Sequence, residues 1–184
     1  MSGSNDRGRY AARFPGGQRS PANANPGRAI GAVFLAWLIF IGIDFLFHAS
    51  ILRLLWDDPV PAFLEPQTLF ERIPFGYGSF LVLVILVFHL LTRIHGRLPE
   101  PGAALTFGLF FGGLFSLNHF LALYSFVAIP AKHLGIFSLV YFLELTVVSW
   151  LLAALLSGIT VGRILGTVGA LILLLAGGVA IQNL

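Results

Sequence analysis

The sequence predicts an all-α integral membrane protein, a bundle of four transmembrane helices with a fifth at the C-terminal end. Charged residues make up only 10% of the 184-residue chain, and the mean hydropathy is +0.89. A soluble domain carries about 25% charged residues, so a water-soluble fold of this composition would lack the charges that keep its surface in solution. Long apolar runs then indicate membrane spans.

Two features of the composition exclude other classes of protein. The chain has no cysteine, which excludes disulfides, thiolate metal sites and cysteine nucleophiles. The net charge is +3, but the basic residues gather in the N-terminal tail and on one side of the predicted spans. Membrane topology explains that distribution, so the lipid bilayer is the expected partner and nucleic acid is not.

Residues 1–28 are predicted to form a disordered basic tail. The segment is rich in Gly, Ser, Pro and Asn, and Asp6 is its only acid. Its basic residues are Arg7, Arg9, Arg13, Arg19 and Arg28. Too little apolar surface is present to offset the entropy lost on ordering.

The transmembrane bundle is predicted to occupy residues 29–184, with spans at about 29–52, 75–91, 103–129, 134–156 and 164–181. The first span is too long, and begins too far along the chain, for an ordinary cleaved signal peptide. The last is just long enough to cross a hydrocarbon core that needs about 20 residues. A re-entrant or interfacial helix is the alternative for that last segment.

The long loop at residues 53–74 is predicted to lie on the outer membrane surface. Its acids are Asp57, Asp58, Glu65 and Glu71, and its large apolar residues are Trp56, Phe63, Leu69 and Phe70. Aromatic residues prefer the headgroup region. Pro66 can open a short helix at residues 67–72, because proline suits the first helical position.

Basic residues also predict the orientation. With the N-terminus inside, eight basic residues are cytoplasmic and three are outside. The inner set is the five tail arginines with Arg93, Arg97 and Arg163, and the outer set is Arg53, Arg72 and Lys132. The positive-inside rule therefore places the N-terminus in the cytoplasm. The arrangement resembles that of short polytopic bacterial membrane proteins, which implies the plasma (inner) membrane.

Small residues at helical spacing mark two predicted packing stripes. Gly108 and Gly112 lie one turn apart in the third span, and Gly158, Gly162 and Gly166 follow the same spacing near the C-terminal end. Helices in lipid associate through close contact of small residues. Packing within the bundle, docking to another membrane subunit and contact with a second copy of the chain all fit this pattern.

Polar residues inside the spans form the candidate site. Asp44, His48, Asn118, His119 and Glu144 fall at overlapping depth in the outer half of the membrane. A charge at the bilayer centre costs about 2.5 to 3.5 kcal/mol on insertion scales, so these groups must face the bundle interior, be neutral or have partners. His95 and His133 are assigned to turns at the membrane surface.

Three interpretations of this polar set stay open. In a structural role, Asp44 pairs with His48 or His119, and Glu144 bonds to Asn118, Tyr141 or a backbone group. In a functional role, the carboxyl and imidazole groups bind or conduct a proton, an ion or a small ligand, and Asn118 orients them.

The third interpretation is a metal or haem site. His48 and His119 could ligate a haem iron from two helices, or the acids and imidazoles could hold a divalent cation. The Glu-x-x-His motif of di-iron bundles is missing, and the sequence requires no cofactor.

A binding or conducting membrane protein is the predicted function. The small size and the glycine stripes also fit a structural or accessory subunit of a larger membrane complex. No catalytic motif is present, and little of the chain lies outside the membrane to hold a soluble substrate. An enzyme is therefore the least expected class, although a small redox protein stays among the alternatives.

Overall fold

The computed structural model describes residues 26–55, 60, 63–95 and 100–183. The tail arginines Arg7, Arg9, Arg13 and Arg19, the loop residues Trp56, Asp57 and Asp58, and Arg97 lie outside the described residues. Within the described ranges every regular element is a helix: α1 (Pro26–Leu46), the π-helical turn η2 (Phe47–Ile51), the 3-10 turn η3 (Arg53–Leu55), α2 (Pro66–His95), α3 (Pro101–Phe126), α4 (Ala131–Leu156) and α5 (Val161–Gln182). The five α-helices are long and apolar enough to cross a membrane. The predicted all-α membrane fold is therefore confirmed.

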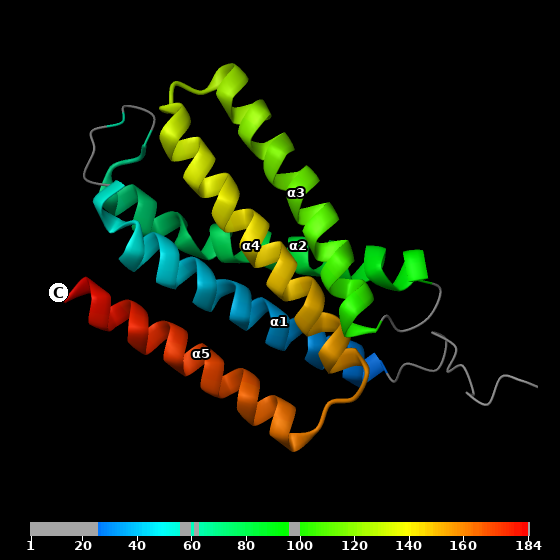
Figure 1. Cartoon of the computed structure of the whole chain (residues 1–184). Helices are drawn as coiled ribbons and strands as arrows, with labels where there is room; N and C mark the ends of the chain where they lie inside the picture. The colour runs from blue at the N-terminus through cyan, green and yellow to red at the C-terminus, as the bar shows by residue number, and fades with distance from the viewer. Residues whose placement is uncertain (1–25, 56–59, 61–62, 96–99, 184) are drawn as a thin grey trace, which may run out of the picture.

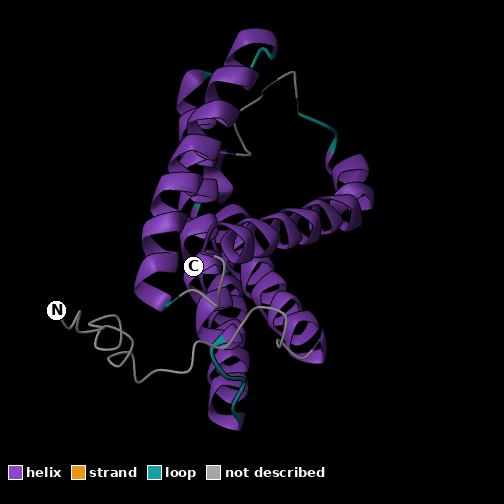
Figure 2. Ribbon diagram, turned by 90° about the vertical axis from the view of Figure 1, so that its right-hand side faces the viewer, coloured by secondary structure: helices purple, strands orange, loops and turns teal. Residues whose placement is uncertain are grey.

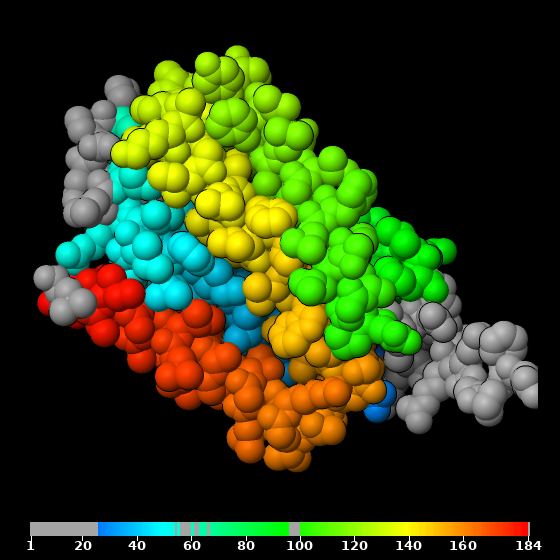
Figure 3. All heavy atoms as spheres, in the orientation of Figure 1, coloured from blue at the N-terminus to red at the C-terminus, as the bar shows by residue number. Residues whose placement is uncertain are grey.

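The five helices run alternately up and down, with α4 at the centre (Figure 1). The most extensive helix interface joins α3 to α4, while α1 packs on both α4 and α5. In the space-filling view of Figure 3, α1 is visible between α4 and α5. Helix α5 therefore packs mainly on α1 and little on α4.

Helix α2 packs less extensively on the other helices than any of the other four does. It passes behind α1 and α4 in Figure 1, and Figure 2 shows it leaving the other helices at a slant. Its attachment to α1 uses the Trp37 indole, which donates to the Tyr77 carbonyl at 2.8 Å, and Phe40 stacked on Phe80 with ring centroids 4.5 Å apart. A helix of this length accommodates the bilayer by tilting.

Glycines allow the close approach of α3 to α4. A Cβ at Gly108 would lie 2.9 Å from the Thr146 Cα and from the Ser149 Cβ, and one at Gly112 would lie 3.1 Å from the Phe142 carbonyl. The first glycine stripe of the sequence therefore lies inside the bundle, at its longest helix contact. This close packing replaces the hydrophobic effect, which does not drive association in lipid.

The second glycine stripe lies differently. A Cβ at Gly162 or Gly166 would meet nothing within 4 Å, and one at Gly158 would approach only Arg163 Nη1, at 3.7 Å. The glycines that do pack α5 on α1 are Gly42 and Gly178. A Cβ there would lie 2.8 Å from Leu171 and 2.7 Å from the Phe45 ring, respectively.

The fifth helix runs the full length of α1. Near the start of α1, a Cβ at Gly31 would lie 3.5 Å from Ile159, just before α5 begins. At the other end, Gln182 Nε2 donates to the Ala49 carbonyl at 2.6 Å. The segment is therefore a continuous helix that runs antiparallel to α1 and is long and apolar enough to cross a membrane.

Three predicted boundaries are wrong, each at a proline. The loop predicted at 53–74 ends at Pro66, because α2 continues through Pro74 without a break. Membrane helices tolerate an internal proline since their neighbours satisfy the freed backbone groups. Likewise α1 begins at Pro26 inside the predicted tail, and α4 takes up the predicted turn at Lys132 and His133. Proline occupies the first turn of a helix at no cost in hydrogen bonds.

Candidate functional site

Asp44 and His48 lie where α1 changes its winding. Asp44 is in the last α-helical turn, and His48 is in the π-helical turn that follows. Asp44 Oδ1 lies 3.7 Å from His48 Nε2, and both side chains are 21% exposed. The distance is that of an ion pair and is too long for a hydrogen bond. The π-helical turn is itself notable, because such turns occur frequently at functional sites.

The last turns of α5 hold the π-helical turn in place. Ser50 is buried, and its hydroxyl donates to the Gly178 carbonyl at 2.8 Å. Gln182 Nε2 bonds the Ala49 carbonyl, and Arg53 Nη1 donates back to the Gln182 carbonyl. Gly178 permits this approach, since a Cβ there would lie 3.0 Å from Ser50 Oγ. Thus α5 helps to position the turn that carries His48.

Glu144 is the most deeply buried acid of the described residues. It is 1% exposed, and its Oε1 atom has no hydrogen-bond partner in the part of the chain that the structure describes. The bonds to Asn118, Tyr141 or a backbone group that the structural interpretation predicts do not form. The nearby acid is Asp44 on α1, which interacts with Glu144 electrostatically. We call the buried Glu144 and the partly exposed Asp44 of the neighbouring helix the acid pair.

Tyr141 connects this acid pair to the other helices. Its ring centroid lies 4.9 Å from that of His119 and 5.8 Å from that of Phe115, both on α3, and 6.4 Å from that of Phe80 on α2. Tyr141 also interacts electrostatically with Glu144 and Asp44. Tyr141 was predicted only as a partner for Glu144. Tyr141 precedes Glu144 by three residues and so shares its helical face, which is the sequence feature that could have identified it as a site residue.

The adjacent residues Asn118 and His119 lie in different surroundings. His119 is half-buried, and its Nδ1 is hydrogen bonded to Ser138 Oγ at 3.1 Å. Asn118 is exposed on the other side of α3, because consecutive helical residues point in directions about 100° apart. Asp44, His48 and His119 lie toward α4, which carries Glu144, whereas Asn118 is left out. Tyr141 and Ser138 of α4 join the site.

The two histidines named as metal-ligand candidates, His48 and His119, lie on different elements. Among the residues that the structure describes, no three His, Asp or Glu side chains form a group that could hold a metal ion. The two histidines contact different α4 side chains: the His48 ring lies 5.2 Å from that of Phe137, and His119 bonds Ser138.

The two ends of the bundle differ in polarity. His133, assigned to a turn by the sequence, is instead buried at the start of α4, and its Nε2 donates to the Leu55 carbonyl at 3.3 Å. Phe137 lies between the two histidines, with its ring 5.2 Å from His48 and 6.4 Å from His133. Toward the other end lies one hydrophobic cluster, with the buried Thr146 and Ser149 of α4 between its members. The cluster consists of Ala32, Ala36, Phe40, Phe80, Val84, Val87, Leu91, Ala104, Leu145, Val148, Leu152, Ala153, Leu155 and Leu156.

Comparison with protein-family models, with curated proteins and with solved structures gives no significant match.

Proposed function

We propose that this polytopic membrane protein reversibly binds a proton, or a small cation, at the acid pair Asp44 and Glu144. The observation that carries the proposal is the buried Glu144 carboxyl, whose Oε1 lacks a hydrogen-bond partner in the described chain while a second acid lies close by. A buried carboxylate without a partner is strongly unfavourable, and two carboxylates that share a site do not both ionise readily. A shared proton or a bound cation relieves both costs.

The surroundings of the pair are suited to proton exchange. His48 on η2 lies 3.7 Å from Asp44. Tyr77 on α2 and Tyr141 on α4 interact electrostatically with Asp44, and the ring of His119 on α3 contacts that of Tyr141. Imidazole and carboxyl groups are the usual components of proton relays in membranes. None of these side chains is basic enough to neutralise the pair permanently, as an arginine would.

We infer from the distribution of polar groups that protons reach the pair from one side, which favours binding over conduction. The histidines lie toward the end of α1 that the charge distribution predicts to be outside, whereas the apolar cluster fills the other end. The buried hydroxyls of Thr146 and Ser149 donate to carbonyls of their own helix, each at 2.7 Å. They are therefore not free to continue a relay toward the cytoplasmic end.

Infrared difference spectroscopy across a pH step tests this proposal in lipid nanodiscs. We expect a protonated buried carboxyl band in the wild-type protein that disappears in Glu144→Gln and shifts in Asp44→Asn. Glu100→Gln is the matched control, since Glu100 is exposed at the start of α3, and it should leave the band unchanged. Loss of the band on adding salt at constant pH would identify a cation as the ligand.

A band that is absent from the wild-type spectrum, or that is the same in the three variants, would contradict the proposal. Sustained proton flux through vesicles containing the protein would contradict the one-sided access.

A second candidate, a structural or accessory subunit, is favoured by the open glycine face of α5. Gly162 and Gly166 have room for a neighbouring helix, because nothing in the described chain lies within 4 Å of a Cβ placed there. For this role we expect native mass spectrometry in lipid to show a second chain in fixed ratio. Gly162→Leu should remove that chain, whereas Gly177→Leu, equally free of contacts on the same helix, should keep it. A monomer in native lipid would rule out this role.

A further inference from the structure

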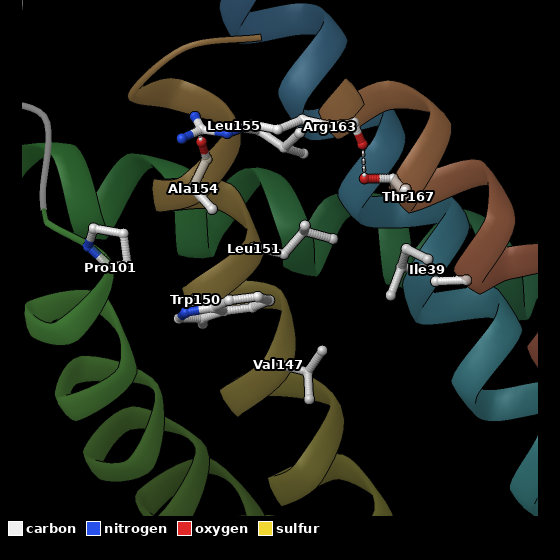
Figure 4. Close-up of a pocket in the computed structure, with 11 residues that line it drawn as sticks. Ile39, Pro101, Val147, Trp150, Leu151, Ala154, Leu155, Arg163 and Thr167 are labelled. Atoms are coloured by element: carbon white, nitrogen blue, oxygen red, sulfur yellow. Dashed lines mark hydrogen bonds between the residues drawn. The ribbon is translucent and has the colours of Figure 1, made fainter. Parts of the chain in front are cut away.

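A pocket of about 550 Å³ opens between α4 and α5, away from the acid pair. Figure 4 shows its walls: Val147, Trp150 and Leu151 of α4, with Ile39 of α1 and Pro101 of α3. The pocket exists because α5 leans on α1 and leaves a gap beside α4 (Figure 3). Trp150 and Val147 are 45% and 38% exposed, so these walls face the lipid phase in a membrane.

One end of the pocket carries a positive charge. Arg163 extends from the first turn of α5 across the end of α4 (Figure 4). Its Nη1 donates to the Ala154 carbonyl, to the Gly158 carbonyl at 2.6 Å and to Ser157 Oγ at 2.9 Å. A guanidinium has five N–H donors on three nitrogens, and Nε and Nη2 have no acceptor in the described part of the chain. Donors therefore remain for an anion.

The other polar groups of the lining are the Thr167 hydroxyl and the Trp150 indole N–H. The Thr167 hydroxyl donates to the Arg163 carbonyl at 2.8 Å, so it is already satisfied. Ala170, the α5 residue of the lining farthest along the chain from Arg163, lies seven residues beyond it, or about 10 Å along the helix. The pocket thus combines one cation at the end of the membrane span with an apolar channel directed toward the membrane interior.

We propose that this pocket binds an anionic phospholipid, with the phosphate on Arg163 and one acyl chain between α4 and α5. Basic pockets between helices on the cytoplasmic side bind the headgroups of anionic lipids, and Arg163 lies on the side where the basic residues of this chain concentrate. The charge and the apolar walls, in this order along the membrane normal, match such a lipid. A free phosphate would gain nothing from the apolar walls, and an apolar partner helix would leave the charge of Arg163 unused.

The test is lipid retention in native mass spectrometry. The full-length protein is taken from nanodiscs that contain equal parts of phosphatidylglycerol and phosphatidylcholine, and is released into mild detergent. We expect one retained phosphatidylglycerol in the wild-type protein. Arg163→Gln should reduce the preference for phosphatidylglycerol by about fivefold, the factor that corresponds to roughly 1 kcal/mol for one basic residue near an anionic surface.

A matched pair of glycine variants separates lipid binding from changes in folding. Gly166 lines the pocket and Gly169 does not, and a Cβ at either position would meet nothing within 4 Å. Gly166→Leu should lose the retained lipid, and Gly169→Leu should keep it. Equal retention by the two variants, equal retention of both lipid types by the wild-type protein, or a second protein chain in place of the lipid would each overturn the proposal.

Discussion

Gly108→Leu is expected to destabilise the protein by about 3 kcal/mol, the upper end of the usual cost of overpacking a core. Any side chain at this position begins with a Cβ only 2.9 Å from the Thr146 Cα and 3.0 Å from the Thr146 carbonyl oxygen. Backbone atoms cannot rotate away as a side chain can, so α3 and α4 would have to separate. Because the α3–α4 interface is the most extensive in the bundle, its disruption should destabilise the whole fold.

Gly162→Leu supplies the matched control for this measurement. It places the same side chain in a membrane helix where nothing lies within 4 Å of the Cβ. The free energy of unfolding in bicelles, measured by steric trapping, should therefore stay within about 0.5 kcal/mol of the wild-type value. If both variants were destabilised equally, the close α3–α4 contact would not be what limits stability.

Glu144→Met is expected to stabilise the protein by about 1 to 3 kcal/mol, the usual penalty for a buried polar group without a partner. Methionine is unbranched, adapts to irregular space and carries no charge. Glu144 is 1% exposed, and its Oε1 has no hydrogen-bond partner in the described chain, so the substitution removes a cost and breaks no described bond. The same variant should lose the pH-dependent carboxyl band.

This pair of results distinguishes a functional acid from a structural one. An acid that holds the helices together would make the protein less stable when it is replaced. Leu145→Met, at the adjacent and fully buried position, controls for the flexibility of methionine and should cost less than about 1.5 kcal/mol. Destabilisation by Glu144→Met beyond that control would support the structural interpretation.

Composition and run length alone determined the class of this protein and predicted four spans, with an alternative left open for the fifth segment. A chain with 10% charged residues and five long apolar stretches has few ways to satisfy its backbone in lipid other than helices. Spacing along one helix was equally informative. Asp44 and His48, four residues apart, do lie side by side, because helical periodicity relates them without reference to any other element.

Contacts between helices were decided only by the tertiary structure. Two adjacent residues of α3 take opposite roles, with His119 hydrogen bonded to α4 and Asn118 exposed. Gly42 and Gly178 pack α5 on α1, while the more regular stripe of Gly162 and Gly166 stays open.

The physical reason lies in the membrane environment. A soluble helix shows its buried face by an apolar stripe, but a membrane helix is apolar on every side, since lipid and protein interior are alike. Sequence therefore identifies which residues share a helix face, and only the packed bundle shows which face meets a neighbour.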